Sequence, residues 1–214
     1  MTGKPIARRT LLATAAGLAV APFVATGTAH AAVPKIYLDP GHGGTDPGAS
    51  ANGLQEKNVT LNIALQVRNI LNATYGTRVS IRTSRTSDIT RSLQSRTDDA
   101  NAWGANVFIS IHCNAGGGTG FESFRYPTVG STTLRLHDLM HANVIAGMRT
   151  VASVTDRGKK TANFHVLRET AMPAILTENL FVDTVADANK LKNAAFITAT
   201  ARGHANGIAR FFGL

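Results

Sequence analysis

The feature that most constrains the fold is an alternation of strand-like and helix-like segments over residues 35–112. Residues 35–39 form an apolar strand-like run, and residues 56–73 follow with apolar side chains at helical spacing, including Val59, Ile63 and Val67. Residues 78–83 alternate as a strand does, residues 90–103 fit a helix, and residues 106–112 form another buried strand. This order predicts an α/β fold with a mostly parallel, twisted sheet flanked by helices.

The second half of the chain continues the mixed pattern. We expect strands at residues 121–126, 164–167 and 174–177, and helices at residues 132–151 and 195–211. No repeat, low-complexity tract or linker follows residue 32, so residues 32–214 are predicted to form a single domain.

The first 31 residues have the composition of a secretory signal peptide. Lys4, Arg8 and Arg9 precede an apolar run over residues 11–24, and the sequence AHA at residues 29–31 supplies a small-x-small cleavage site. The arginine pair and the leucines that follow it favour the twin-arginine export route over the general secretory route. No other feature of the segment supports this choice. The alternative, a membrane anchor, needs roughly 20 apolar residues. This run is shorter and contains Pro22, so we expect cleavage after residue 31 and a secreted, wall-associated protein.

The charge of the chain limits the classes of binding partner, and its cysteine content limits the possible disulfides. Residues 1–31 hold three basic and no acidic side chains, so their removal lowers the formal charge from +9 to +6. A basic surface favours polyanions, and export makes intracellular nucleic acid the least suitable of them. No later apolar stretch is long enough to span a membrane, and Cys113 has no second cysteine with which to form an intramolecular disulfide.

Four side chains with metal-binding or proton-transfer chemistry fall at one edge of the predicted sheet. His42 lies just beyond the first strand, His112 ends a buried strand, and Glu178 ends the strand at residues 174–177. Glu56 opens the first helix, which begins at that same edge. Because open α/β sheets bind ligands at the carboxyl ends of their strands, we expect these four residues to converge.

Their chemistry suits a metal-dependent hydrolase. Two imidazoles and one carboxylate form a common catalytic zinc shell, and a nearby carboxylate can move protons. Spacing alone leaves open which glutamate binds the ion and which is the base. Taken singly, His42 could be a turn residue, His112 a core histidine and Glu56 a helix N-terminal acid. A carboxylate directly after an apolar strand, as at Glu178, is harder to explain without a function.

Four motifs resemble the zinc-dependent N-acetylmuramoyl-L-alanine amidases, a family that includes bacterial autolysins and phage lysins. They are DPGHGG at residues 39–44, GLQEK at 53–57, SIHCNA at 110–115 and PAILTE at 173–178. The resemblance covers residues 35–212. It implies Zn²⁺ bound by His42, Glu56 and His112, with Glu178 as the catalytic acid and base. It also implies cleavage of the amide bond between N-acetylmuramic acid and L-alanine in peptidoglycan.

The resemblance further implies an enzyme that is active without an activator protein, because no inhibitory insertion is visible beyond the helix at residues 132–151. We expect the catalytic domain or its charge to target the wall, because no separate wall-binding domain is visible in the sequence, and we expect a monomer. Two positions depart from the family pattern: Leu180 replaces a common Gly and could reshape the groove floor, and Cys113 replaces a common Ala. Cys113 should point away from the metal, because successive strand side chains alternate.

Other interpretations remain. The sequence HDLMH at residues 137–141 places His137 and His141 one helical turn apart, as in some metalloproteases, but Asp replaces the usual Glu. A non-catalytic wall-binding module would also fit secretion and basic charge, whereas no G-x-S-x-G elbow supports a serine hydrolase. His165 has no context that assigns it a role. Four arginines are expected to pair with aspartates or face solvent: Arg82, Arg85, Arg91 and Arg96, with Asp88, Asp98 and Asp99 as partners.

Overall fold

A computed structural model describes residues 1–3 and 32–214, and residues 32–214 form one compact unit. The predicted signal peptide lies almost wholly outside the described residues. Within the described part of the chain, no helix combines the length and apolar character that crossing a membrane requires.

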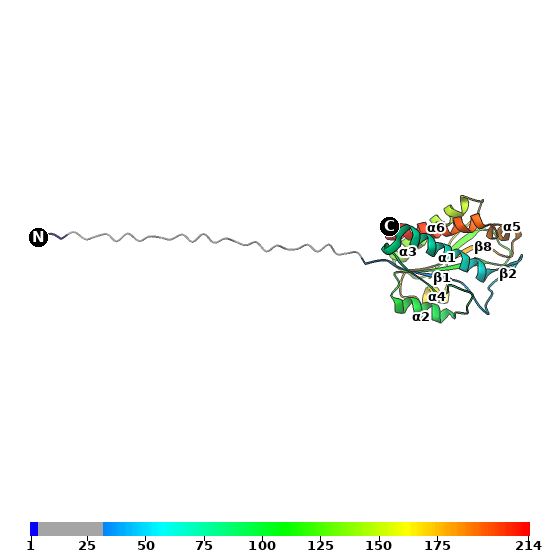
Figure 1. The fold of residues 1–214 in the computed structure, drawn as a ribbon, viewed down its shortest axis with the longest axis horizontal. Coiled ribbons are helices and arrows are strands. Elements are labelled where there is room, and N and C mark those ends of the chain that lie inside the picture. The colour runs from blue at the N-terminus through cyan, green and yellow to red at the C-terminus, as the bar shows by residue number, and fades with distance from the viewer. Residues whose placement is uncertain (4–31) are drawn as a thin grey trace. The chain divides into compact units, whose positions relative to one another are not determined.

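The described domain contains eight strands and six α-helices (Figure 1). The strands are β1 (Lys35–Pro40), β2 (Ser50–Ala51), β3 (Leu54–Gln55), β4 (Ser80–Thr83), β5 (Val107–Asn114), β6 (Phe121–Arg125), β7 (Asp156–Thr161) and β8 (Ala174–Phe181). The helices are α1 (Glu56–Tyr75), α2 (Leu93–Trp103), α3 (Ser131–Arg149), α4 (His165–Arg168), α5 (Val185–Leu191) and α6 (Ala194–Phe212), with a 3₁₀ turn η1 (Gly76–Arg78) after α1.

Six strands form one mixed sheet in the order β4-β1-β5-β8-β6-β7. Strands β4, β1, β5 and β8 are mutually parallel, β6 runs antiparallel to β8, and β7 is parallel to β6. The predicted α/β class with a mostly parallel sheet is therefore confirmed. The short strands β2 and β3 form a separate hairpin between β1 and α1.

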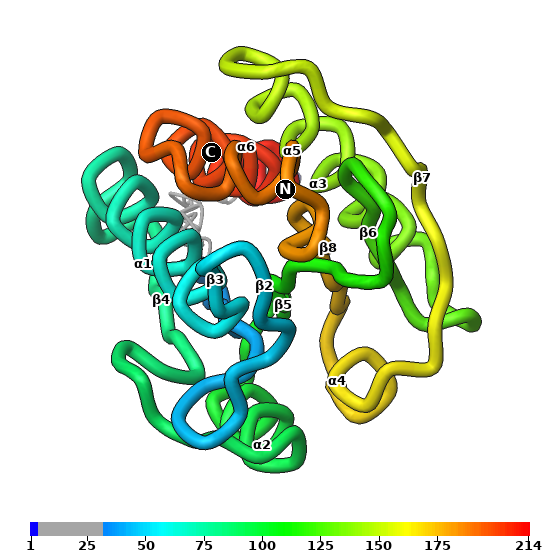
Figure 2. The backbone as a smooth tube through the Cα atoms, turned by 90° about the vertical axis from the view of Figure 1, so that its right-hand side faces the viewer, coloured from blue at the N-terminus to red at the C-terminus, as the bar shows by residue number. Residues whose placement is uncertain are grey.

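Helices cover both faces of the sheet (Figure 2). On one face, α1, α3 and α6 pack over the larger apolar cluster, which contains Ile36 and Leu38 of β1. On the other face, α2 and α4 pack over a smaller cluster that contains Tyr37. Strand β1 is thus buried on both sides, which explains its continuous apolar sequence.

Three local predictions need correction. Residues 164–167 were expected to form a strand, but His165–Arg168 is the short helix α4. Val166 and Leu167 are adjacent in sequence and both join the smaller apolar cluster, which a strand would prevent by sending them to opposite faces. Strand β8 continues past Thr177 to Phe181, and the mostly exposed strand β7 was missed because its sequence, DRGKKT, is polar.

Candidate metal centre and active site

The loop after β1 carries His42 in a left-handed backbone conformation, with φ of 61°. Two glycines allow this loop to lie against the other site residues. A Cβ atom at Gly41 would collide with the ring of His112, and one at Gly48 would lie 2.7 Å from Glu56 Oε2. The absence of a side chain at Gly41 and Gly48 therefore permits close packing around the site.

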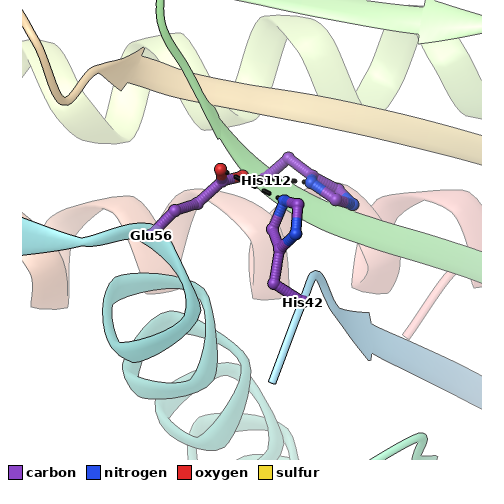
Figure 3. A group of neighbouring side chains, drawn as sticks. All are labelled: His42, Glu56 and His112. Atoms are coloured by element: carbon purple, nitrogen blue, oxygen red, sulfur yellow. Dashed lines mark hydrogen bonds and ion pairs between the residues drawn. The ribbon is translucent and has the colours of Figure 1, made fainter. Parts of the chain in front are cut away.

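His42, Glu56 and His112 meet at the carboxyl edge of the sheet (Figure 3). They come from the β1 loop, the first residue of α1 and strand β5. One potential ligand atom from each lies within 4.8 Å of the others. His42 Nε2 is 3.1 Å from Glu56 Oε2, and His112 Nδ1 is 3.1 Å from Glu56 Oε1. No second cluster of this kind occurs among residues 1–3 and 32–214.

Neighbouring groups keep Glu56 ionised and orient the ring of His42, as metal binding requires. Burial raises the pKa of Glu56, but hydrogen bonds with His112 and His42 outweigh that effect and hold it well below its usual range. Backbone N–H groups of Ala49 and Cys113 also donate to its carboxylate. His42 Nδ1 lies 2.8 Å from Asp46 Oδ2, so Nε2 is the ring nitrogen directed at the cluster. A carboxylate behind a histidine is the usual outer partner of a metal ligand, and the donor set fits a divalent cation.

Two buried arginines bind backbone carbonyl groups of the loop that carries His42. Arg96 donates to Asp39 Oδ1 at 2.6 Å and to the carbonyl oxygens of Pro40 and His42. Arg85 donates to the carbonyl oxygens of Pro40 and Gly41. Both side chains are 2% exposed, so the expectation that they pair with Asp88, Asp98 or Asp99 is wrong. Only the pairing of Arg82 and Arg91 with Asp99 agrees with it.

Glu178 lies directly across from His112 in the pairing of β8 with β5. The sequence suggested that Glu178 ends its strand, but β8 continues beyond it to Phe181. Glu178 nevertheless lines a pocket together with His42 and His112. Its Oε2 is buried and has no hydrogen-bond partner. Burial, followed by the negative charges of Glu56 and Glu122, raises the pKa of Glu178 well above its ordinary value. All four predicted site residues are therefore neighbours in space.

Comparison with known proteins identifies the family. Residues 36–210 match the N-acetylmuramoyl-L-alanine amidase family Amidase_3. The chain belongs to this family. The amidase CwlM of Bacillus licheniformis is 62% identical over 180 residues, which are 84% of this chain and 69% of that protein. The sporulation-specific N-acetylmuramoyl-L-alanine amidase of Bacillus subtilis (strain 168) is 59% identical with the same coverage.

Solved structures agree. The crystal structure of an N-acetylmuramoyl-L-alanine amidase from Clostridium difficile 630 gives a TM-score of 0.79 at 31% identity, covering 85% of this chain and 97% of that chain. The resemblance seen in the four motifs is confirmed, and the amidase is a hydrolase of peptidoglycan.

The sequence pattern did not indicate one acidic neighbour of Glu178. Glu122 of β6 lies opposite Glu178 on the neighbouring strand and is 4% exposed. Arg157 and Lys160 form ion pairs with its carboxylate. Burial raises the pKa of Glu122, but hydrogen bonds from Lys160 and Arg157 outweigh that effect and lower it. The antiparallel register of β6 on β8, which no local sequence pattern specifies, places Glu122 beside Glu178.

His137 and His141, the alternative metal-binding pair, are buried and belong to a hydrogen-bond network. His137 Nε2 and His141 Nδ1 lie 2.8 and 2.7 Å from Ser123 Oγ, and His141 Nε2 lies 2.9 Å from Asp156. Burial lowers the pKa of His137 to about 4, which keeps that ring neutral. This chain has the connectivity of a Ser-His-Asp triad, but Ser123 is fully buried and cannot attack a substrate. Both histidines therefore have structural partners.

The two departures from the family pattern are both core residues of the amidase. Cys113 is 4% exposed within the larger apolar cluster and does not belong to the metal cluster. This agrees with the prediction that its side chain points away from the metal. Leu180 is also fully buried in that cluster and adopts a φ of 70°. It lies where the pairing of β5 with β8 shifts register, so its left-handed backbone belongs to an irregularity in the strand. Leu180 thus packs in the core and does not line the groove.

Proposed function

We propose that this chain is a zinc-dependent amidase that hydrolyses the amide bond between the lactyl group of N-acetylmuramic acid and L-alanine. The proposed zinc ligands are His42, Glu56 and His112, and the proposed catalytic acid and base is Glu178. The observation that carries the proposal is the convergence of three ligand atoms within 4.8 Å beside a buried carboxylate that lacks a partner.

Zinc is the metal that this donor set favours. Two imidazole nitrogens and one carboxylate, with a fourth position open, form a recurrent catalytic zinc shell. When bound, a zinc ion supplies Lewis acidity, which polarises a carbonyl group and lowers the pKa of water. Asp46 contributes by fixing the ring of His42, and Arg85 and Arg96 contribute by fixing the backbone of its loop.

Glu178 carries the proton transfers. As a carboxylate it accepts a proton from the attacking water while the water oxygen bonds to the lactyl carbonyl carbon. It then gives that proton to the L-alanine nitrogen as the C–N bond breaks. The products are a free lactyl carboxylate on the sugar and an L-alanine amino terminus on the peptide. A raised pKa suits a group that must return its proton near neutral pH.

Digestion of purified walls tests the reaction and the roles together. Mass spectrometry should find new L-alanine amino termini without new reducing sugars. Glu178→Gln should retain zinc, measured by elemental analysis, and lose activity by about 10²- to 10⁴-fold. His42→Ala and His112→Ala should lose the metal as well. A Glu178→Gln enzyme that keeps most of its activity would exclude the proposed acid and base.

We also propose that residues 1–31 direct export and are removed, so that the basic domain acts on the anionic wall as a secreted monomer without an activator. The formal charge of the domain alone, +6, supports attraction to such a wall. Amino-terminal sequencing should show that the secreted protein begins at residue 32. Replacing Arg8 and Arg9 with lysines should block export only if the twin-arginine route is used.

A further inference from the structure

Two pockets adjoin the proposed metal centre. One, of about 410 Å³, includes Asp46, Thr90 and Arg91. The other, of about 210 Å³, lies between α4 and β8 and includes Glu178 and His165. Both share His42 and His112, so a substrate bound at the metal centre can extend into each of them.

Two residues that line the smaller pocket each have a buried polar atom without a partner among the described residues. Four buried side-chain nitrogen or oxygen atoms of the described residues have no hydrogen-bond partner, and two of them are Glu178 Oε2 and His165 Nε2. Buried polar atoms are nearly always paired in native proteins, so two orphans in one pocket indicate that a ligand supplies their partners. His165 is not part of the metal cluster, so the ligand that it lacks is not the ion.

The walls of this pocket indicate what kind of ligand it accepts. Leu176 lines it from β8, and Leu93 and Phe164 line it while remaining 55% and 37% exposed. Exposed large apolar side chains beside a pocket suit contact with apolar ligand atoms. A small methyl-bearing residue, with polar groups on its backbone, matches this combination of apolar walls and two polar atoms.

The proton path decides which part of the substrate enters. This step rests on the proposed function, in which Glu178 returns a proton to the nitrogen of L-alanine. That nitrogen must lie beside Glu178, so the peptide side of the scissile bond extends into the pocket that Glu178 lines. The muramoyl side then lies toward the larger pocket. The first polar group on the peptide beyond the scissile nitrogen is the carbonyl oxygen of L-alanine.

We propose that His165 is a substrate-binding residue, whose Nε2–H donates a hydrogen bond to the L-alanine carbonyl oxygen of the stem peptide. The bond orients the leaving side of the scissile amide so that its nitrogen meets Glu178. His165 thereby selects an amino-acid residue, with its carbonyl group, over a simple amine at the leaving position.

A pair of ligands isolates this hydrogen bond. N-acetylmuramoyl-L-alaninamide contains the carbonyl group, whereas N-acetylmuramoyl-isopropylamide retains the scissile amide but has a methyl group in place of the carboxamide. Binding of each would be measured by calorimetry to the zinc-loaded Glu178→Gln protein, so that hydrolysis does not interfere. The variants are His165→Phe, which keeps a ring but no donor, and His165→Gln, which keeps a donor. Glu169→Gln, an exposed change at the end of the same helix, is the matched control.

His165→Phe should weaken binding of the alaninamide on the order of tenfold, leave the isopropylamide unchanged and keep full zinc content. His165→Gln should recover most of the loss, and Glu169→Gln should bind both ligands normally. Equal weakening of both ligands, no weakening, or loss of zinc from His165→Phe would overturn the proposal. The amidase function is tested separately by the wall products of the wild-type enzyme, so failure of one conclusion is distinguishable from failure of the other.

Discussion

At the residue scale, the metal centre depends on a side chain outside the ligand set. Asp46 accepts from His42 Nδ1 and also from the backbone N–H of Gly48, so it fixes both the ring and the loop. Burial raises the pKa of Asp46, but the hydrogen bonds from His42 and Gly48 and the charge of His42 together outweigh that effect and lower it. It is therefore ionised at neutral pH and holds the proton of His42 on Nδ1, leaving Nε2 free to bind a metal.

Asp46→Ala should weaken zinc binding by about 10- to 100-fold, because the ring of His42 loses its orientation and its negative partner. Competition with a coloured chelator measures the affinity. Asp98→Ala is a suitable control, since that carboxylate only accepts from Gln94 within α2. Equal zinc affinity in the two variants would show that the loop alone positions His42.

Another single residue makes stability depend on pH. His204 of α6 is fully buried; its Nδ1 donates to the carbonyl oxygen of Thr200, and its Nε2 accepts from Thr177. Burial lowers its pKa to about 4. Because the unfolded chain binds the proton more tightly, the stability present above pH 6.5 is lost as the pH falls toward 4.

Urea unfolding at pH 7 and pH 4.5 should show this loss. Wild-type protein should lose about 2–3 kcal/mol more than His204→Gln over that interval, since Gln takes up no proton. His137 adds a similar dependence in both proteins, and therefore cancels in the comparison. Parallel losses in the two proteins would mean that His204 becomes protonated without unfolding the core around it.

At the scale of elements, the alternation of strands and helices over residues 35–112 was readable because strands β1, β4 and β5 each carry a local pattern. Strands β1 and β5 are buried on both faces and therefore read as continuous apolar runs. Helix α4 was missed because four residues are too few for a helical period to show. The position of Glu122 beside Glu178 was missed because it arises from a strand pairing between distant segments. The convergence of the four candidate site residues was predictable because each lies near the carboxyl end of a strand or opens a helix, which the sequence does locate.

The two buried arginines show how elements are joined beneath the site. Arg96 of α2 crosses to the carboxyl end of β1, where it pairs with Asp39 and the loop carbonyl groups. Burial raises the pKa of Asp39, but the charge of Arg96 together with hydrogen bonds from Ser84 and Arg96 outweighs that effect and lowers it. Asp39 therefore remains an anion in the core and needs a cation beside it.

Arg96→Met should destabilise the protein by about 3–5 kcal/mol, because it leaves the Asp39 carboxylate buried without its partner. Adding Asp39→Asn in the same chain should recover part of that loss, since an amide costs less to bury than an unpaired charge. Urea unfolding of the wild type, both single variants and the double variant measures the coupling. Strict additivity of the two single effects would contradict a direct interaction.

At the scale of the whole molecule, the proposed zinc ion links parts of the chain that are distant in sequence. Its ligands come from residues 42, 56 and 112, and so from a loop, a helix and a central strand. A metal that binds only the folded arrangement stabilises it by mass action. The gain is about 2.7 kcal/mol when the free metal is a hundredfold above its dissociation constant.

Removal of zinc with a chelator should therefore lower the melting temperature of the wild-type amidase, and added zinc should restore it. Glu178→Gln should respond to zinc in the same way, because Glu178 is not proposed to bind the ion. His42→Ala should melt at one temperature with or without zinc, since one ligand of three is lost. Calorimetry on the three proteins separates metal binding from catalysis. A zinc-dependent melting temperature in His42→Ala would place the ion elsewhere and remove the basis for the proposed centre.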